Sequence, residues 1–151
     1  QGPKRVAAPQ LNAQALADYN RLLELKPQLF EGLYNRATLR LTADNLDGAI
    51  SDYTQALSIN PRDHDCYFYR AQARERKGEL ESAVGDYGKV IELNPQSAEA
   101  YAGRGILRLT QRKDTEAKAD FDQCLKINPA MKESLNRRIV YAKYQRAKKK
   151  R

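Results

Sequence analysis

The sequence is poor in the residues that build metal centres and disulfide frameworks. It has one histidine, His64, and two cysteines, Cys66 and Cys124, which form no CxxC motif. A zinc site here would lack ligands, so we expect neither a metal nor any other cofactor. A disulfide between them is one alternative, but two separated cysteines are more typical of free thiols in a reducing compartment. We therefore expect a cytoplasmic protein.

Other signatures are missing as well. No apolar run approaches the roughly 20 residues that a membrane helix needs, so we expect no membrane insertion. There is no glycine-rich phosphate loop, no GxSxG and no HExxH. His64 and Cys66 would point about 200° apart on a helix, which does not suit a base and its nucleophile. We therefore predict that the chain is not an enzyme.

The net charge of +8 is concentrated at the carboxyl end. Residues 132–151 contain nine basic side chains and one acid, Glu133, so this segment alone carries +8. The other 131 residues hold 18 basic and 18 acidic side chains. Contact with a polyanion is therefore an interpretation for the last segment only.

The amino end reads as an addition to the folded part. Gln1-Gly2-Pro3 looks like the remnant of a cleaved tag, and two prolines lie within residues 1–9. We expect residues 1–9 to be disordered or tag-derived, and the chain to be a piece of a longer protein.

A 34-residue repeat organises the rest of the sequence. The dipeptides Asn60-Pro61, Asn94-Pro95 and Asn128-Pro129 recur at that step, one period after Lys26-Pro27. Three segments align without gaps: Leu33-x2-Arg36-Ala37-x2-Arg40, Tyr67-x2-Arg70-Ala71-x2-Arg74 and Tyr101-x2-Arg104-Gly105-x2-Arg108. So do Ala49-x3-Tyr53, Ala83-x3-Tyr87 and Ala117-x3-Phe121. The apolar periodicity within each repeat indicates two helices, and the proline ends the second.

This pattern resembles the tetratricopeptide repeat, whose 34-residue unit has small, aromatic and proline residues at fixed positions. The resemblance covers residues 30–129 as three full repeats, flanked by half repeats at 11–29 and 132–144. Arginine replaces the usual leucine and tyrosine of the first half. The resemblance implies an all-α fold, in which antiparallel helix pairs stack into a right-handed superhelical solenoid with a C-terminal capping helix.

We expect eight helices, at residues 10–26, 30–43, 46–59, 63–77, 80–93, 97–111, 115–127 and 131–147. They form one domain, with a half repeat at 10–29, full repeats at 30–63, 64–97 and 98–131, a capping helix at 131–147 and a basic tail at 148–151. Asp63 and Ser97 stand where N-caps are wanted. Asp44, Gly78 and Arg112 mark the turns inside the three repeats.

Two arginine series and one aspartate series follow the same step. The first is Arg36, Arg70, Arg104 and Arg138; the second is Arg40, Arg74 and Arg108; the third is Asp18, Asp52, Asp86 and Asp120. We interpret the first and third as interhelix ion pairs, with Arg138 pairing with Asp120 or another neighbour. The second suits the helix macrodipole, with an anion-binding row as the alternative, and Arg108 is the member we expect to contact something else.

The resemblance also implies that the first helices of the repeats line a concave, peptide-binding groove. The residues facing it would be Tyr34, Asn35, Thr38, Leu41, Phe68, Tyr69, Gln72, Ala102, Gly103, Ile106, Asn136, Arg137 and Val140. Aromatic rings supply rigid contact area, and the amides of Asn35 and Gln72 can pair with a peptide backbone. Ala102 and Gly103 would leave a hollow for a partner side chain. The rings of Tyr34 and Phe68 could instead be packing between repeats.

One binding mode of this family is not expected here. Its Lys–Asn–Arg clamp for the terminal carboxylate of chaperone tails keeps only Asn35, since Asp65 and Tyr69 replace the Lys and the Arg.

The last helix has an apolar stripe, Leu135, Ile139 and Ala142, that can cover the open end of the repeats. The stripe stops at Arg146. We expect Arg146, Lys148, Lys149, Lys150 and Arg151 to have little to pack against. They read as a solubilising helix end, with salt-dependent contact to nucleic acid or an acidic partner as the alternative.

The sequence thus predicts a non-catalytic protein-interaction module, part of a larger protein, that holds an extended peptide or a partner helix in its groove. Two alternatives stay open. One is nucleic-acid or acidic-surface binding through the basic end, and the other is an architectural repeat segment for self-association. The identity of the partner and the oligomeric state do not follow from the sequence.

Overall fold

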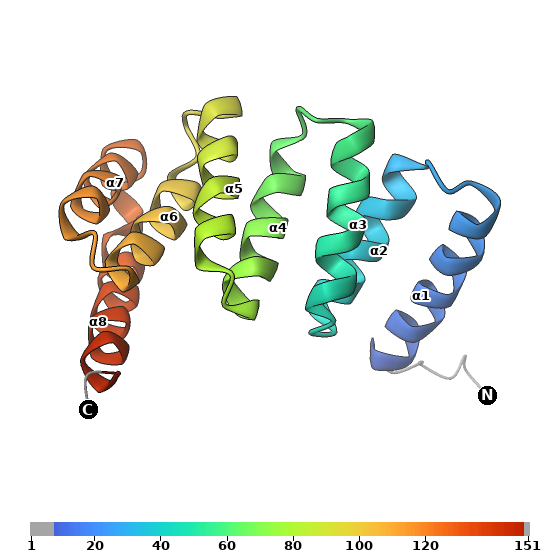
Figure 1. Ribbon diagram of the computed structural model, residues 1–151, viewed down its shortest axis with the longest axis horizontal. Helices are drawn as coiled ribbons and strands as arrows, with labels where there is room; N and C mark the ends of the chain where they lie inside the picture. Colours follow the sequence, from blue (N-terminus) through green and yellow to red (C-terminus); the bar gives the residue numbers. More distant parts are fainter. Residues whose placement is uncertain (1–7, 150–151) are drawn as a thin grey trace, which may run out of the picture. The chain divides into compact units, whose positions relative to one another are not determined.

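The computed structural model describes residues 8–149, and side chains from residue 12 onward. This part of the chain is all-α (Figure 1). Its elements are α1 (Ala8–Leu25), α2 (Phe30–Thr42), α3 (Leu46–Ile59), α4 (His64–Lys77), α5 (Leu80–Leu93), α6 (Ala98–Thr110), α7 (Asp114–Ile127), the 3₁₀ turn η1 (Pro129–Met131) and α8 (Lys132–Lys148). The predicted helices are confirmed to within two residues at each end. Because α1 begins at Ala8, the last two residues of the segment set aside as 1–9 are helical.

Local sequence accounts for the helix ends. Asp63 Oδ1 accepts from the Cys66 N–H at 2.8 Å, and Ser97 Oγ accepts from the Ala100 N–H at 3.3 Å, which confirms both predicted N-caps. The turn inside each repeat uses a left-handed residue, with φ of 61° at Asp44, 88° at Gly78 and 64° at Arg112. Only glycine adopts this conformation without cost, so the repeat imposes it on the aspartate and the arginine.

Contacts divide the chain into two compact units, an N-terminal unit, Gln1–Ala73, and a C-terminal unit, Arg74–Arg151. The boundary lies inside α4 and does not coincide with a boundary between repeats. The core of the N-terminal unit includes Leu33, Ala37, Tyr53, Leu57 and Cys66. The C-terminal unit has two clusters, one including Ala102, Cys124, Met131 and Leu135, the other including Ile106, Leu109, Ala117 and Ala142.

Small residues allow the paired helices to approach closely, as the repeat predicts. Ala37, Ala49, Ala83 and Ala117 are fully buried. A Cβ added at Gly105 of α6 would lie 2.5 Å from the Phe121 ring of α7, so this contact depends on the absence of a side chain. α6 and α7 therefore pack as an antiparallel pair within the C-terminal unit (Figure 1).

Both cysteines are core residues. Cys66 and Cys124 are free and fully buried, and burial raises the pKa of each thiol. Cys124 thus packs as a small hydrophobe in a cluster of the C-terminal unit. None of the helices described combines the length and the apolar character that a bilayer span requires.

Candidate functional site

A buried aspartate joins two arginines in the N-terminal unit. The side chain of Asp52 on α3 is 1% exposed, and Arg36 on α2 binds it in a bidentate fork, from Nη2 to Oδ1 at 2.8 Å and from Nε to Oδ2 at 2.9 Å. Arg40, one helical turn further on, donates from Nη1 to Oδ2 at 2.8 Å. One carboxylate thus fixes the register of α2 against α3 by three charge-assisted hydrogen bonds.

The C-terminal unit repeats this arrangement. Asp120 on α7 accepts the fork of Arg104, at 2.8 and 3.1 Å, and the Nη1 donor of Arg108 at 2.8 Å. Arg74 donates to Asp86 at 2.7 Å. The predicted ion pairing of Arg36 with Asp52 and of Arg104 with Asp120 is confirmed.

The sequence predicted where the second arginine series lies on its helices, but not which residues it binds. Its members do lie in the last turns of their helices. They also bind the aspartate 12 residues further along the chain, so they do not form an open anion-binding row. The expectation that Arg108 would contact something else is wrong, because Asp120 satisfies its Nη1.

The terminal members of the aspartate series and of the first arginine series, Asp18 and Arg138, have other neighbours than the middle members. Asp18 is exposed, and its carboxylate accepts from Gln14 at 3.2 Å. Asp120 is occupied by Arg104 and Arg108, and Arg138 instead lines a cavity together with Glu75. Of the two alternatives given for Arg138, Asp120 is therefore not its partner, and the other neighbour is Glu75.

Five rings of the N-terminal unit form a continuous cluster, which we call the aromatic surface: Phe30, Tyr34, Tyr53, Phe68 and Tyr69. Tyr34 and Tyr69 each contact three other rings, and the ring centroid of Tyr69 lies 6.3 Å from Tyr34, 6.2 Å from Tyr53 and 5.5 Å from Phe68. Tyr53 is fully buried, whereas the other four rings are only partly buried. The interpretation of Tyr34 as packing between repeats is confirmed by its contact with Tyr69, and the role of Tyr34 and Phe68 in a groove stays a prediction.

Polar groups border the aromatic surface. Asn35 is exposed and Gln72 is half-buried. The Thr38 hydroxyl is used inside the unit, since it donates to the Tyr34 carbonyl and shares a hydrogen bond with Tyr53 Oη, each at 3.0 Å. Burial, together with Tyr69 and nearby acids, raises the pKa of Tyr34 to about 12, so its hydroxyl remains protonated at neutral pH.

The hollow expected at Ala102 and Gly103 is absent, because both residues are buried. A Cβ added at Gly103 would lie 2.5 Å from Cζ of Tyr87, so the ring of Tyr87 already occupies the space next to this glycine. Ile106 is 9% exposed and belongs to the core. These three predicted groove residues serve packing within the C-terminal unit.

Leu41 of α2 was also expected to face the groove, but it is 8% exposed and belongs to the core of the N-terminal unit. The three predicted groove residues of α8 lie together on one side of that helix. Asn136, Arg137 and Val140 line a shallow groove of about 530 Å³ with Glu133, Tyr141 and Tyr144. We call these six residues the α8 face. Sequence reasoning missed Tyr141 and Tyr144, although both follow Arg137 at the spacing of a single helix face.

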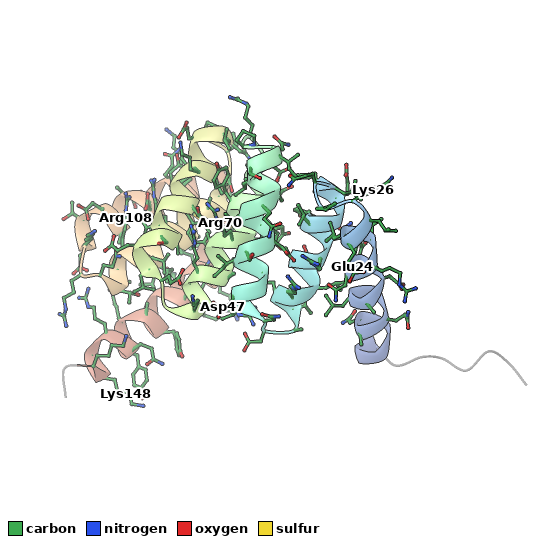
Figure 2. All side chains as sticks on the ribbon, turned by 45° about the vertical axis from the view of Figure 1, so that its right-hand side comes forward. Glu24, Lys26, Asp47, Arg70, Arg108 and Lys148 are labelled. Carbon is green, nitrogen blue, oxygen red and sulfur yellow. The ribbon has the colours of Figure 1, made fainter. Side chains whose placement is uncertain are left out.

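Hydrogen bonds hold part of the basic C-terminal end against the C-terminal unit. Arg146 donates from Nη1 to the Leu109 carbonyl at 3.0 Å and binds Asp114 with both terminal nitrogens. The expectation that Arg146 has little to pack against is wrong, because the helix pair α6–α7 provides these acceptors. Lys148, at the far end of α8 (Figure 2), and Lys149 are exposed, while Lys150 and Arg151 lie outside the described residues.

A half-buried carboxyl group faces a cavity of about 270 Å³ in the C-terminal unit. Glu75 lines it with Leu80, Ile106, Arg138 and Gln145, among others. Tyr87 Oη donates to Glu75 Oε2 at 3.0 Å. Burial raises the pKa of Glu75, and the Tyr87 hydrogen bond and Arg138 only partly oppose this effect.

The raised pKa of Glu75 predicts how stability depends on pH. The favourable contribution of the protonated group is complete below its unfolded pKa and is lost as pH rises through its folded pKa. Glu75→Gln keeps an acceptor for Tyr87 and removes this loss. We expect the variant to have the higher Tm at pH 8 and no advantage at pH 4. A difference in Tm that is the same at both pH values would contradict this reasoning.

Comparison with known proteins agrees with the repeat pattern. The family model described as tetratricopeptide repeat matches residues 10–64, 34–92 and 70–131. The search of curated sequences found no significant match.

Several solved structures share this fold. A crystal structure of MamA is 16% identical, with 92% of this chain and 90% of that chain covered and a TM-score of 0.76. The fragment "MamA 41-end" from Desulfovibrio magneticus RS-1 is 17% identical, covering 79% and 67%, with a TM-score of 0.74. The first TPR of Spaghetti (RPAP3), bound to the HSP90 peptide SRMEEVD, is 24% identical, covering 78% and 93%, with a TM-score of 0.69. At these identities the likeness concerns the fold.

The family matches together run from residue 10 to residue 131 and so cover most of the sequence. They coincide with the helix pairs, the small residues at their contacts and the prolines that follow them. The chain therefore belongs to the tetratricopeptide repeat family.

Proposed function

We propose that the chain is a non-catalytic protein-interaction module whose N-terminal unit binds an extended peptide on the aromatic surface. Tetratricopeptide repeats support a role in protein–protein interaction, and the similar Spaghetti domain is bound to a peptide. The observation that carries the proposal is the partly buried ring cluster of Tyr34, Phe68 and Tyr69, with the amides of Asn35 and Gln72 on the same two helices. Rings offer a rigid apolar platform, and amides pair with a peptide backbone at low selectivity.

The chemistry of this surface favours a neutral or basic peptide with apolar side chains. Asp65 is exposed, and after burial and Tyr69 it is a further cause of the raised pKa of Tyr34, so an acidic tail would meet an unfavourable charge here. Arg36 and Arg40 are bound to Asp52 and are not available to a carboxylate. This agrees with the absence of the carboxylate clamp in the sequence.

The test begins with decapeptides selected from a random displayed library on the intact chain. We expect Tyr69→Ala combined with Asn35→Ala to weaken the selected peptides about tenfold or more, because ring contacts dominate such interfaces. Affinity is measured by fluorescence anisotropy, and circular dichroism checks that helicity is retained.

A matched control removes one ring and one amide elsewhere in the same unit. Tyr67→Ala combined with Gln55→Ala should change the affinity less than twofold, since Tyr67 stacks on Arg70 and Gln55 is an exposed residue of α3. Equal affinities of the intact chain and the Tyr69–Asn35 variant would refute the proposal.

A further inference from the structure

The α8 face exposes more apolar surface than a capping helix requires. Val140, Tyr141 and Tyr144 are 68%, 64% and 60% exposed. A terminal helix needs a polar outer surface to stay soluble, and contiguous exposed apolar residues mark interaction sites. The α8 face therefore calls for an explanation that capping does not provide.

The other side of α8 already holds the helix in place. Leu135 and Ala142 are 1% and 7% exposed and belong to the two clusters of the C-terminal unit, with Ile139 packed against both. Arg146 adds its contacts to Leu109 and Asp114. Residues of the α8 face are thus not needed to anchor the helix, and they are available to a partner.

The charges around the α8 face select the kind of partner. Lys132, Arg137, Lys143 and Lys148 are exposed on this helix, and Glu133 is the single acid among its residues. The ion pair of Arg137 with Glu133 is 3.7 Å long and largely exposed to water, so it does little to neutralise the positive charge of this helix. An acidic partner is favoured, whereas pairing α8 with α8 of a second copy would bring like charges together.

The shape of the α8 face suits a helix. Its residues follow the spacing i, i+3, i+4, i+7, i+8 and i+11, so they form one straight strip about 17 Å long. A second helix with apolar residues at the same spacing can lie along Val140, Tyr141 and Tyr144 in the shallow groove. Glu or Asp on its flanks would then reach Arg137 and Lys143.

We propose that the α8 face binds an acidic amphipathic helix of a protein partner. This rests on the proposed role in protein interaction, but it concerns a second surface in the other unit. The partner helix contributes leucine-like residues to the groove and carboxylates to its basic border. Affinity and salt dependence should both follow from this pairing.

The probe is a synthetic amphipathic helix of about 18 residues, or five turns, with leucines on one face and glutamates on its flanks. Its control has lysine in place of every glutamate. We expect binding of the acidic peptide by the intact chain, weaker binding at high salt, and no binding of the lysine peptide. Anisotropy with a labelled peptide gives the affinities.

Two variants test the contributions separately. Arg137→Glu should weaken the acidic peptide about tenfold, while Lys126→Glu, an equal charge change at an exposed site on α7, should change the affinity less than twofold. Tyr141→Ser combined with Tyr144→Ser should cause a similar loss. Because these side chains are exposed, helicity and Tm should stay near the values of the intact chain.

Four outcomes would overturn the proposal. They are equal binding of the two peptides, unchanged affinity in the tyrosine variant, retention of the chain by anionic vesicles but not by the acidic peptide, and a dimer that the tyrosine variant abolishes. The Tyr69–Asn35 variant should bind the acidic peptide normally. If it alone loses that peptide, the helix binds in the N-terminal unit, and this inference fails while the proposed function stands.

Discussion

Replacing Asp52 by asparagine is expected to lower the free energy of unfolding by about 3 kcal/mol. The variant has nearly the same shape, but it leaves Arg36 and Arg40 without their carboxylate in a place where each is largely buried. The Asn amide also presents N–H donors to guanidinium donors. Removing one member of a buried ion pair is costly because the remaining charges stay desolvated.

Urea unfolding followed by circular dichroism measures this loss, and hydrogen exchange in α2 and α3 shows where it acts, since repeat proteins can unfold in parts. Asp47→Asn, an exposed aspartate on the same helix (Figure 2), is the control and should cost less than about 0.5 kcal/mol. A loss at Asp52 no larger than at Asp47 would show that the arginines are not held by this carboxylate.

Tyr87→Ala is expected to cost about 4 kcal/mol, the largest effect of a single truncation proposed for this chain. The side chain is 2% exposed, its hydroxyl donates to Glu75, and its ring fills the space next to Gly103. The same urea experiment measures the loss. A cost below about 1 kcal/mol would contradict the packing of this ring.

The contact of Tyr87 with Gly103 also predicts a change of sign. In the intact chain Gly103→Ala should destabilise by about 1 kcal/mol, because the clash with the ring outweighs the gain in helix propensity. In the Tyr87→Ala background the same change should stabilise by about 1 kcal/mol. Gly85→Ala is the control, since a Cβ at Gly85 meets nothing within 4 Å and should stabilise both backgrounds. The contact does not exist if the two glycines behave alike.

Helix positions could be predicted because the repeat carries redundant signals. A proline such as Pro61, a cap such as Asp63 and a left-handed turn residue such as Asp44 each mark an end, and the 34-residue step transfers them to the other repeats. Apolar periodicity then fixes which face is buried. Where the repeat gives no matching signal, at the start of α1, the error reached two residues.

The partners of Arg40 and Arg108 could not be found from one helix alone. Their acceptors, Asp52 and Asp120, lie 12 residues away on the next helix, and contact at that separation depends on how two helices cross. The sequence did contain a signal, because the arginine and aspartate series keep this offset in every repeat. The offset shows that the residues are related but does not show that one aspartate can hold two guanidinium groups.

The packing around the predicted groove residues differs between the two units. The aromatic residue in the second helix of a repeat contacts the residue 16 positions further along the chain. Tyr53 therefore stacks on the ring of Tyr69, whereas the ring of Tyr87 covers Gly103. The small side chains of Ala102 and Gly103 on α6 therefore suggest a hollow, but Tyr87 of the neighbouring helix α5 fills it. On α8, the prediction used the apolar stripe that packs on the core and did not include Tyr141 and Tyr144, although they are among the most exposed apolar residues described.

Binding of a selected decapeptide to the aromatic surface is tested most directly by ¹H–¹⁵N NMR spectra of the labelled chain. We expect shifts concentrated at Tyr34, Asn35, Tyr69 and Gln72, on the two helices that carry the partly buried rings of the N-terminal unit. Amides of α5, α7 and the α8 face should stay unchanged. Shifts confined to those elements, with none around Tyr69, would contradict the assignment of peptide binding to the aromatic surface.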